Sequence, residues 1–180
     1  LKALIEQFGG AARLLPISRD DEDSLRTILG LCEDADVIVT LGGASVGDHD
    51  LVRQVAEDSG LETSFYKVAM RPGKPLMAGR YNATPMIGLP GNPVSALVCG
   101  HVFLRPALDA MLGLAKAPLA RETAILAEDL GPNGPRSHYM RAKLDGSDKT
   151  LTVKAFERQD SSLLSVLSQA DALLVRPVND

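Results

Sequence analysis

The sequence predicts an α/β fold: a three-layer α/β/α domain around a mostly parallel sheet, followed by a small all-β, barrel-like domain. Over residues 1–115, short apolar runs alternate with amphipathic helical patterns, as expected for strands that helices cover on both faces. Beyond a proline-bearing linker that starts near residue 116, short alternating runs dominate as far as residue 180, which is typical of antiparallel strands. We therefore predict two domains, residues 1–115 and residues 116–180.

The first forty residues predict two helices and two strands. Apolar residues recur at helical spacing over residues 1–8, and the glycine pair that follows can end that helix. Residues 11–17 are predicted to form a strand, residues 25–32 an amphipathic helix and residues 37–39 a short buried strand. The sequence opens inside a helical pattern without Met, so we expect a piece of a longer protein.

The next fifty residues predict a glycine loop, a helix, a strand and a hairpin. The helix covers residues 51–59 and the strand residues 62–70. The prolines of residues 71–75 block sheet pairing and predict a loop or a sheet edge. Residues 76–80 and 84–89 flank a short turn and predict a β-hairpin.

The remaining elements are one long helix and a series of short strands. Residues 93–112 predict a buried helix, apolar nearly all round, which Pro106 should kink or reset. The elements predicted after it are strands at residues 122–128, 139–144, 151–156 and 172–176, with a short helix or loop at residues 162–171.

Composition narrows the classes of function. The net charge of −4 provides no overall basic field for nucleic acid. No apolar run approaches the roughly 20 residues of a membrane span. Cys32 and Cys99 are in no C-x-x-C pair, which argues against a zinc site or disulfide framework and suits a reducing cytosol. We expect a cytoplasmic protein with no nucleic-acid or membrane partner, in which local cations hold any anionic ligand.

The loop at residues 40–50 joins the strand at residues 37–39 to the next helix and has the composition of an anion-binding loop. Its glycines allow the backbone to turn and a ligand to approach the main chain, while the following helix points its N-terminal N–H groups at the loop. The candidate ligand-binding residues of this loop are Gly42, Gly43, Ser45 and Gly47.

Acidic residues beside this loop suggest a metal ion. Asp48 and Asp50 follow the glycines, and a hard cation would reconcile their carboxylates with an anionic ligand because it takes oxygen ligands from both. Asp20 follows an earlier predicted strand and could join them. The alternative is that the loop is an ordinary tight turn and that these aspartates cap helices.

A second strand-to-helix junction consists of Pro90, Gly91, Asn92 and Pro93. In a mainly parallel sheet, both junctions would lie at the carboxyl ends of the strands, where α/β folds bind ligands. Asn92 is also a good N-cap, and Pro93 suits the first helical position. A well-made helix start with no further role is therefore the alternative for this segment.

Lys67, Arg71 and Lys74 form the local cationic cluster. Residues four apart on an extended stretch share one face at about 13 Å, so Lys67 and Arg71 could span two ends of a polyanion. A solvated strand edge is the alternative. The chain has no P-loop motif, no G-x-G-x-x-G and no G-x-S-x-G elbow around Ser45, which argues against nucleotidase, dinucleotide-binding and hydrolase classes.

Three segments in this order and spacing, residues 36–50, 67–75 and 88–96, resemble the molybdopterin molybdenumtransferase (MoeA) family, which includes the gephyrin E domain. The resemblance covers nearly the whole chain, more loosely over residues 121–180. It implies an enzyme of molybdenum cofactor biosynthesis that inserts molybdate into adenylylated molybdopterin and releases AMP, with a divalent cation, usually Mg²⁺. Such chemistry needs oxyanion donors, a metal and a cationic cluster rather than a covalent nucleophile.

The resemblance also assigns roles to residues. Asp20, Asp50 and Lys67 match family residues of the catalytic cleft, and Arg71 stands where the family often has a second lysine. A guanidinium keeps the charge but changes a point donor into a fork. The substrate-binding residues implied further along the chain are Pro90, Pro93, Arg141 and Ser161, the last preceded by Asp160 where some relatives have Gly.

In that family the cleft lies between one subunit's C-terminal half and its dimer partner's N-terminal half. The resemblance thus implies a homodimer in the full-length protein, an adenylyltransferase as pathway partner and an inactive isolated fragment. Two alternatives are a molybdopterin adenylyltransferase-like domain, whose glycine loop reads Gly-Gly-Thr-Gly where this chain has Gly42-Gly-Ala-Ser, and a non-catalytic scaffold of the gephyrin type.

Overall fold

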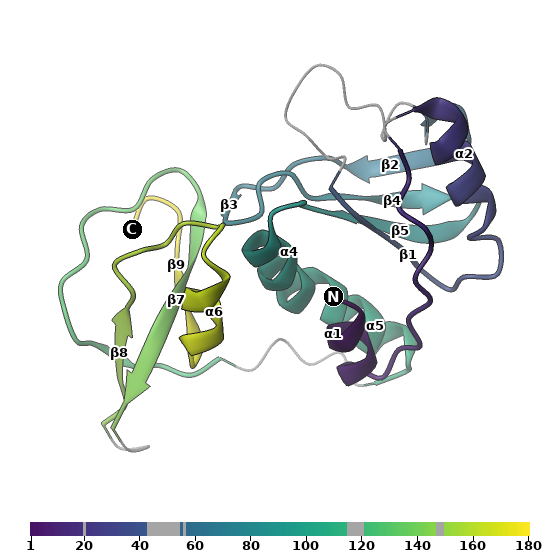
Figure 1. The fold of residues 1–180 in the computed structure, drawn as a ribbon. Coiled ribbons are helices and arrows are strands. Elements are labelled where there is room, and N and C mark those ends of the chain that lie inside the picture. Colours follow the sequence, from purple (N-terminus) through teal and green to yellow (C-terminus); the bar gives the residue numbers. More distant parts are fainter. Residues whose placement is uncertain (20, 43–54, 56, 115–120, 147–149) are drawn as a thin grey trace.

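The computed structural model describes the chain except for residues 20, 43–54, 56, 115–120 and 147–149. Figure 1 shows two β-sheets with helices packed around the first. The helices are α1 (Lys2–Gln7), α2 (Glu22–Gly30), α4 (Pro93–Cys99), the π-helix η1 (Gly100–Leu104), α5 (Arg105–Met111) and α6 (Leu164–Gln169). The strands are β1 (Ile38–Leu41), β2 (Leu61–Phe65), β3 (Met70–Arg71), β4 (Met77–Tyr81), β5 (Thr84–Leu89), β6 (Ile125–Leu126), β7 (Ser137–Asp145), β8 (Thr152–Ala155) and β9 (Ala172–Arg176).

The first sheet has the strand order β1-β5-β4-β2. Strand β1 runs parallel to β5, whereas β4 pairs antiparallel with both β5 and β2. The prediction of a mostly parallel sheet is therefore wrong over the described residues. The predicted hairpin is the reason: Asn82 and Ala83 adopt φ of 46° and 71°, the left-handed geometry that a two-residue hairpin turn requires, so β4 and β5 must be antiparallel.

Helices cover both faces of this sheet, which confirms the three-layer prediction. On one face, Leu29 of α2 and Cys32 pack with Ile38, Met77 and Met86 of three strands. On the other face, α4, η1 and α5 contribute most of a second cluster, in which the buried residues are Met70, Leu76, Leu89, Val94, Val98, Cys99, Leu104 and Leu108. The side chains of successive strand residues point to opposite faces, so β1 and β5 contribute residues to both clusters.

The long helix predicted at residues 93–112 forms, with the reset that Pro106 predicts. The N–H of Arg105 bonds to the carbonyl of Gly100, closing a π-turn, and Pro106, which has no N–H to donate, follows within the first turn of α5. By length and hydropathy alone, residues 93–111 could cross a membrane. Here the apolar side chains of this helix form the core, which accounts for its composition.

Two predicted strands differ from the structure. Residues 11–17 join no ladder, and among the described residues β1 pairs only with β5. The guanidinium of Arg13 instead ties this extended segment to Asp34 and to the carbonyl of Leu31. Residues 62–70 are divided between β2 and β3 because the chain leaves the first sheet at residue 66 and enters the second at Met70.

The second sheet contains β3, β7, β8, β6 and β9. Strand β9 runs along one edge of β7, while β3 and β8 share the other edge. The short strands predicted for this region and the helix at α6 are present, which confirms a second β domain. Its described pairings form an open sheet, because β6 and β9 at its two ends do not pair. The predicted boundary at residues 115–116 falls outside the described residues and stays a prediction.

Candidate functional site

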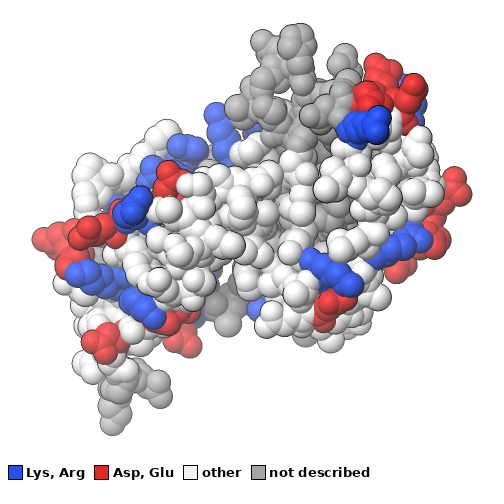
Figure 2. Space-filling view, viewed as in Figure 1, with Lys and Arg blue, Asp and Glu red and all other residues white. Residues whose placement is uncertain are grey.

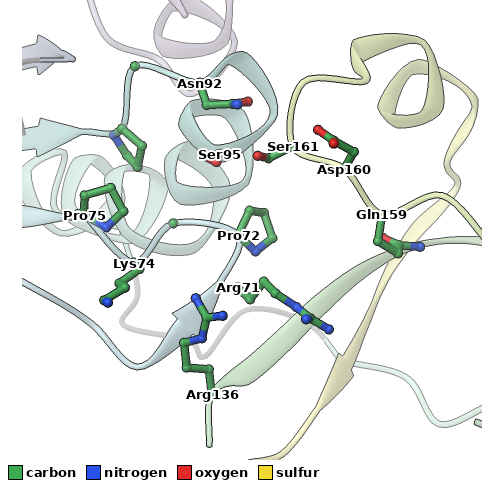
Figure 3. A pocket seen from close by; sticks show the side chains of 13 residues that line it. Arg71, Pro72, Lys74, Pro75, Asn92, Ser95, Arg136, Gln159, Asp160 and Ser161 are labelled. Atoms are coloured by element: carbon green, nitrogen blue, oxygen red, sulfur yellow. The ribbon is translucent and has the colours of Figure 1, made fainter. Parts of the chain in front are cut away.

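A cavity of about 480 Å³ lies where the first sheet's loops meet the second sheet. Figure 3 shows the side chains that line it. They come from four segments that are far apart in the sequence: the loop at residues 71–75, the β5–α4 junction with the first turn of α4, the residue before β7 and the loop after β8. The lining residues are Arg71, Pro72, Gly73, Lys74, Pro75, Pro90, Gly91, Asn92, Ser95, Arg136, Gln159, Asp160 and Ser161.

The loop at residues 71–75 is held tightly against α4. Gly73 has φ of +108°, and a Cβ placed there would collide with the Cys99 sulfur. The N–H of Val68 donates to the carbonyl of Lys74 (3.1 Å) and folds the segment back on itself. The loop therefore presents Arg71 and Lys74 from a fixed backbone, although both residues are exposed.

The two strand-to-helix junctions meet at one edge of the sheet, as the sequence predicts for the part described. Gly42 directly follows β1, and its N–H donates to the carbonyl of Leu89 (3.0 Å) at the end of β5. A Cβ on Gly91 would lie 3.2 Å from the Cα of Gly42. This contact follows from the parallel register that pairs Leu41 with Leu89.

Asn92 occupies the N-cap position of α4 but its side chain makes no capping bond. Its Oδ1 atom is buried and has no hydrogen-bond partner among the described residues. Ser95, one turn further along the helix, is buried at 5% exposure and also lines the cavity. The amide and hydroxyl groups of this wall are therefore available to a polar ligand.

Three cationic side chains, those of Arg71, Lys74 and Arg136, line the opposite wall (Figure 3). None of them has a carboxylate within ion-pair distance among the described residues. The lining carboxylate belongs to Asp160, whose pKa is lowered by hydrogen bonds from the N–H and hydroxyl of Ser162. The cavity thus carries a cationic surplus. Elsewhere on the face in Figure 2, acidic and basic side chains are interspersed.

His138 lies behind Arg71 and is buried, with 3% of its surface exposed. Arg71 Nη2 lies 2.7 Å from His138 Nδ1. Burial, with the nearby charges of Arg71, Arg141, Arg176 and Arg136, lowers the His138 pKa to about 4. The imidazole is therefore neutral at pH 7, and Nδ1 must accept because a guanidinium has only donors.

Arg141 is completely buried and supports the loop at residues 159–161. Its Nη2 donates to the carbonyl of Asp160 (3.0 Å), and its backbone exchanges two hydrogen bonds with the Gln159 side chain. Its Nε and Nη1 have no partner among the described residues. Arg141 does not line the cavity itself, but it fixes the loop that carries Ser161 into the cavity wall.

The structure brings together many of the residues proposed from the sequence. Those that line the cavity are Arg71, Lys74, Pro90, Gly91, Asn92 and Ser161, with Gly42 packed against Gly91. Lys67 and Pro93 do not line it, and the Lys67 ammonium lies 5.2 Å from the centre of the Tyr66 ring. The predicted site residues outside the described residues are Asp20, Gly43, Ser45, Gly47, Asp48 and Asp50.

Sequence reasoning missed Arg136, Ser95 and Gln159. Ser95 lies three residues beyond Asn92, one helical turn away, and that spacing could have identified it. Arg136 precedes β7 and reaches the cavity only because β7 pairs with β3. No local pattern signals that pairing.

No group of three or more His, Cys, Asp or Glu side chains in the described parts of the chain is arranged to hold a metal ion. The predicted ligands Asp48 and Asp50 lie outside those parts.

Comparisons with known proteins agree with this arrangement. Residues 1–110 match the family model described as a probable molybdopterin binding domain, and residues 123–180 match the MoeA C-terminal region (domain IV). The chain is 37% identical to molybdopterin molybdenumtransferase 2 of Mycobacterium tuberculosis, aligning 98% of this chain with 45% of that protein. It is 34% identical to a molybdopterin molybdenumtransferase of Nostoc, aligning 100% of this chain with 43% of that protein.

The fold also has a solved counterpart. The molybdopterin biosynthesis moea protein from Pyrococcus horikosii matches 99% of this chain with a TM-score of 0.79 and 27% identity, over 42% of its own length. The chain thus spans less than half the length of each of these three proteins.

Proposed function

The chain belongs to the MoeA family, and from that premise we propose that it forms the C-terminal half of a molybdopterin molybdenumtransferase. The proposed reaction inserts molybdate into adenylylated molybdopterin and releases AMP. The observation that supports it most directly is the cavity between the two matched regions, which has a cationic wall facing a wall of amide and hydroxyl groups. That combination suits ligands rich in anionic oxygen.

The described residues would act by binding and orientation. Arg71, Lys74 and Arg136 would neutralise oxyanion charge, while Asn92, Ser95 and Ser161 would hydrogen-bond the ligand from the other side. Holding two reactants in a fixed geometry lowers the entropic barrier between them. Bound Mg²⁺, with Asp48 and Asp50 as the proposed ligands, would supply further neutralisation of phosphate charge.

The proposal extends to assembly and location. We expect the full-length protein to be a cytoplasmic homodimer that receives its substrate from an adenylyltransferase. Among the alternatives, a molybdopterin adenylyltransferase-like domain accounts for residues 1–110 alone, whereas the match of residues 123–180 to the MoeA C-terminal region favours the molybdenumtransferase.

Molybdate binding to the 180-residue chain, measured by isothermal titration calorimetry at pH 7.5, tests this function. Lys74→Met should weaken binding about tenfold, the effect of losing one charge-assisted hydrogen bond of about 1.5 kcal/mol. Lys2→Met is the control, because Lys2 pairs with Glu6 on α1, outside the cavity lining. Equal affinities for the wild-type chain and the Lys74 variant would contradict the proposed site.

A second experiment separates an enzyme from a scaffold. Asp50→Asn in the full-length protein should abolish molybdate insertion without changing the fold, as judged by circular dichroism. An unchanged rate of insertion would favour the scaffold of the gephyrin type.

A further inference from the structure

We propose that His138 is a positioning residue for Arg71: its buried imidazole fixes the guanidinium in the cavity wall without cancelling its charge. The inference rests on the proposed function, because it takes Arg71 to be a ligand of the anionic substrate. It assigns to His138 a role that no sequence motif indicates.

Backbone and side chain place the two residues together. Arg71 and His138 are register partners in the parallel pairing of β3 with β7, and Arg71 Nη2 donates to His138 Nδ1 at 2.7 Å. The arginine is exposed whereas the histidine is 3% exposed. One end of the long Arg71 side chain is therefore held in place by a hydrogen bond to the buried His138 ring.

The chemistry of the acceptor matters for an anion site. A carboxylate at this position would form an ion pair with Arg71 and neutralise it. A neutral imidazole accepts the same hydrogen bond and leaves the whole positive charge for a ligand. The charged groups that influence His138 are all cationic, namely Arg71, Arg136, Arg141 and Arg176, and they oppose its protonation.

This arrangement also fixes the imidazole tautomer. Since Nδ1 accepts from Arg71, the proton resides on Nε2. That atom is buried and has no hydrogen-bond partner among the described residues. Among the described residues, the one hydrogen bond of the ring is thus the bond with Arg71.

A double-mutant cycle on molybdate binding by the 180-residue chain at pH 7.5 tests the proposal. His138→Leu removes the acceptor at similar volume, whereas His138→Asn retains an acceptor near the position of Nδ1. We expect His138→Leu to weaken binding about tenfold, as for loss of one charge-assisted hydrogen bond, and His138→Asn to remain within about threefold of wild type. In the Arg71→Met background, His138→Leu should have no further effect, because coupled residues are not additive.

A spectroscopic measurement keeps the test independent of folding losses. In proton NMR titrations, Arg71→Met should raise the pKa of His138, because a nearby cation and a hydrogen bond to the neutral ring are both removed. An unchanged His138 titration would overturn the contact.

The outcomes separate the two proposals. If Arg71→Met weakens molybdate binding but His138→Leu does not, or if the two effects add, His138 does not act through Arg71 and the inference fails while the proposed function stands. If the wild-type chain binds no molybdate, the proposed function fails, and the NMR titration alone decides whether His138 holds Arg71.

Discussion

Gly42 and Gly91 meet backbone to backbone at the carboxyl ends of the parallel strands β1 and β5, so closely that a Cβ on Gly91 would lie 3.2 Å from the Gly42 Cα. The two loops that the sequence associates with ligand binding therefore start from one point. A side chain on Gly91 would press these loops apart, whereas a Cβ on Gly42 would lie at an ordinary contact distance of 3.7 Å from the Gly91 Cα.

The first prediction is that Gly91→Ala destabilises the protein. The added methyl group contacts backbone atoms that cannot rotate away, so we expect a loss of about 1–3 kcal/mol in the free energy of unfolding. Urea denaturation monitored by circular dichroism measures it. Gly131→Ala is the matched control, because its Cβ meets nothing within 4 Å; equal losses in both variants would contradict the prediction.

A second prediction concerns the loop that carries Arg71 and Lys74. Gly73→Ala should cost about 3 kcal/mol or more, since it combines a disfavoured φ of +108° with a collision against the Cys99 sulfur. Gly113→Ala also imposes a positive φ, +70°, but in open space, and should cost only about 1 kcal/mol. The difference between the two unfolding free energies measures the collision together with the greater strain at φ +108°, and a difference near zero would refute the prediction.

A third prediction is acid destabilisation caused by His138. Its pKa is about 4 in the folded protein against about 6.5 in an unfolded chain. Between these values the unfolded state binds a proton that the folded state does not, so stability falls as the pH falls. The slope is about 1.4 kcal/mol per pH unit, or roughly 3 kcal/mol over the whole window, and it vanishes above pH 6.5.

The control for this pH effect is His138→Asn, which cannot titrate. The pH dependence of its unfolding free energy should be shallower than that of the wild-type chain between pH 6.5 and pH 4. Parallel curves for the two proteins would show that another group causes the acid effect.

A fourth prediction concerns Arg136, which the cavity adds to the residues proposed from the sequence. Arg136→Met should weaken molybdate binding about tenfold, by loss of a charged donor, while leaving thermal stability nearly unchanged. Arg121→Met is the control, since Arg121 is exposed and does not line the cavity. Identical affinities of the two variants would exclude Arg136 from the site.

A fifth prediction is that the 180-residue chain binds ligand but does not turn over adenylylated molybdopterin by itself. The resemblance places the rest of the catalytic cleft on another part of the full-length protein. Release of AMP by the isolated chain, followed by chromatography, would disprove this expectation.

Local patterns predicted the parts of the fold that local forces determine. The hairpin around Asn82, the helix start at Pro93 and the reset at Pro106 each depend on backbone preferences within a few residues. Residues 11–17 do not form the predicted strand because they have no partner strand in the described structure. A pattern of apolar residues cannot reveal that absence.

The same distinction between local pattern and tertiary packing applies to the candidate site. Arg71, Lys74 and the junction at residues 90–93 stand in recognisable motifs, and all but Pro93 line the cavity. Arg136 reaches the cavity, and His138 reaches Arg71, through the pairing of β3 with β7, which joins segments 67 residues apart. That pairing is decided by tertiary packing, so no reading of the neighbouring residues could have found it.

Strand β3 belongs to the first domain by sequence and to the second sheet by its hydrogen bonds. If either half were transferred alone into another protein, the pairing of β3 with β7 would be lost, and Arg71 would lose its hydrogen bond with His138. The cavity therefore forms only when both halves of the chain are present together.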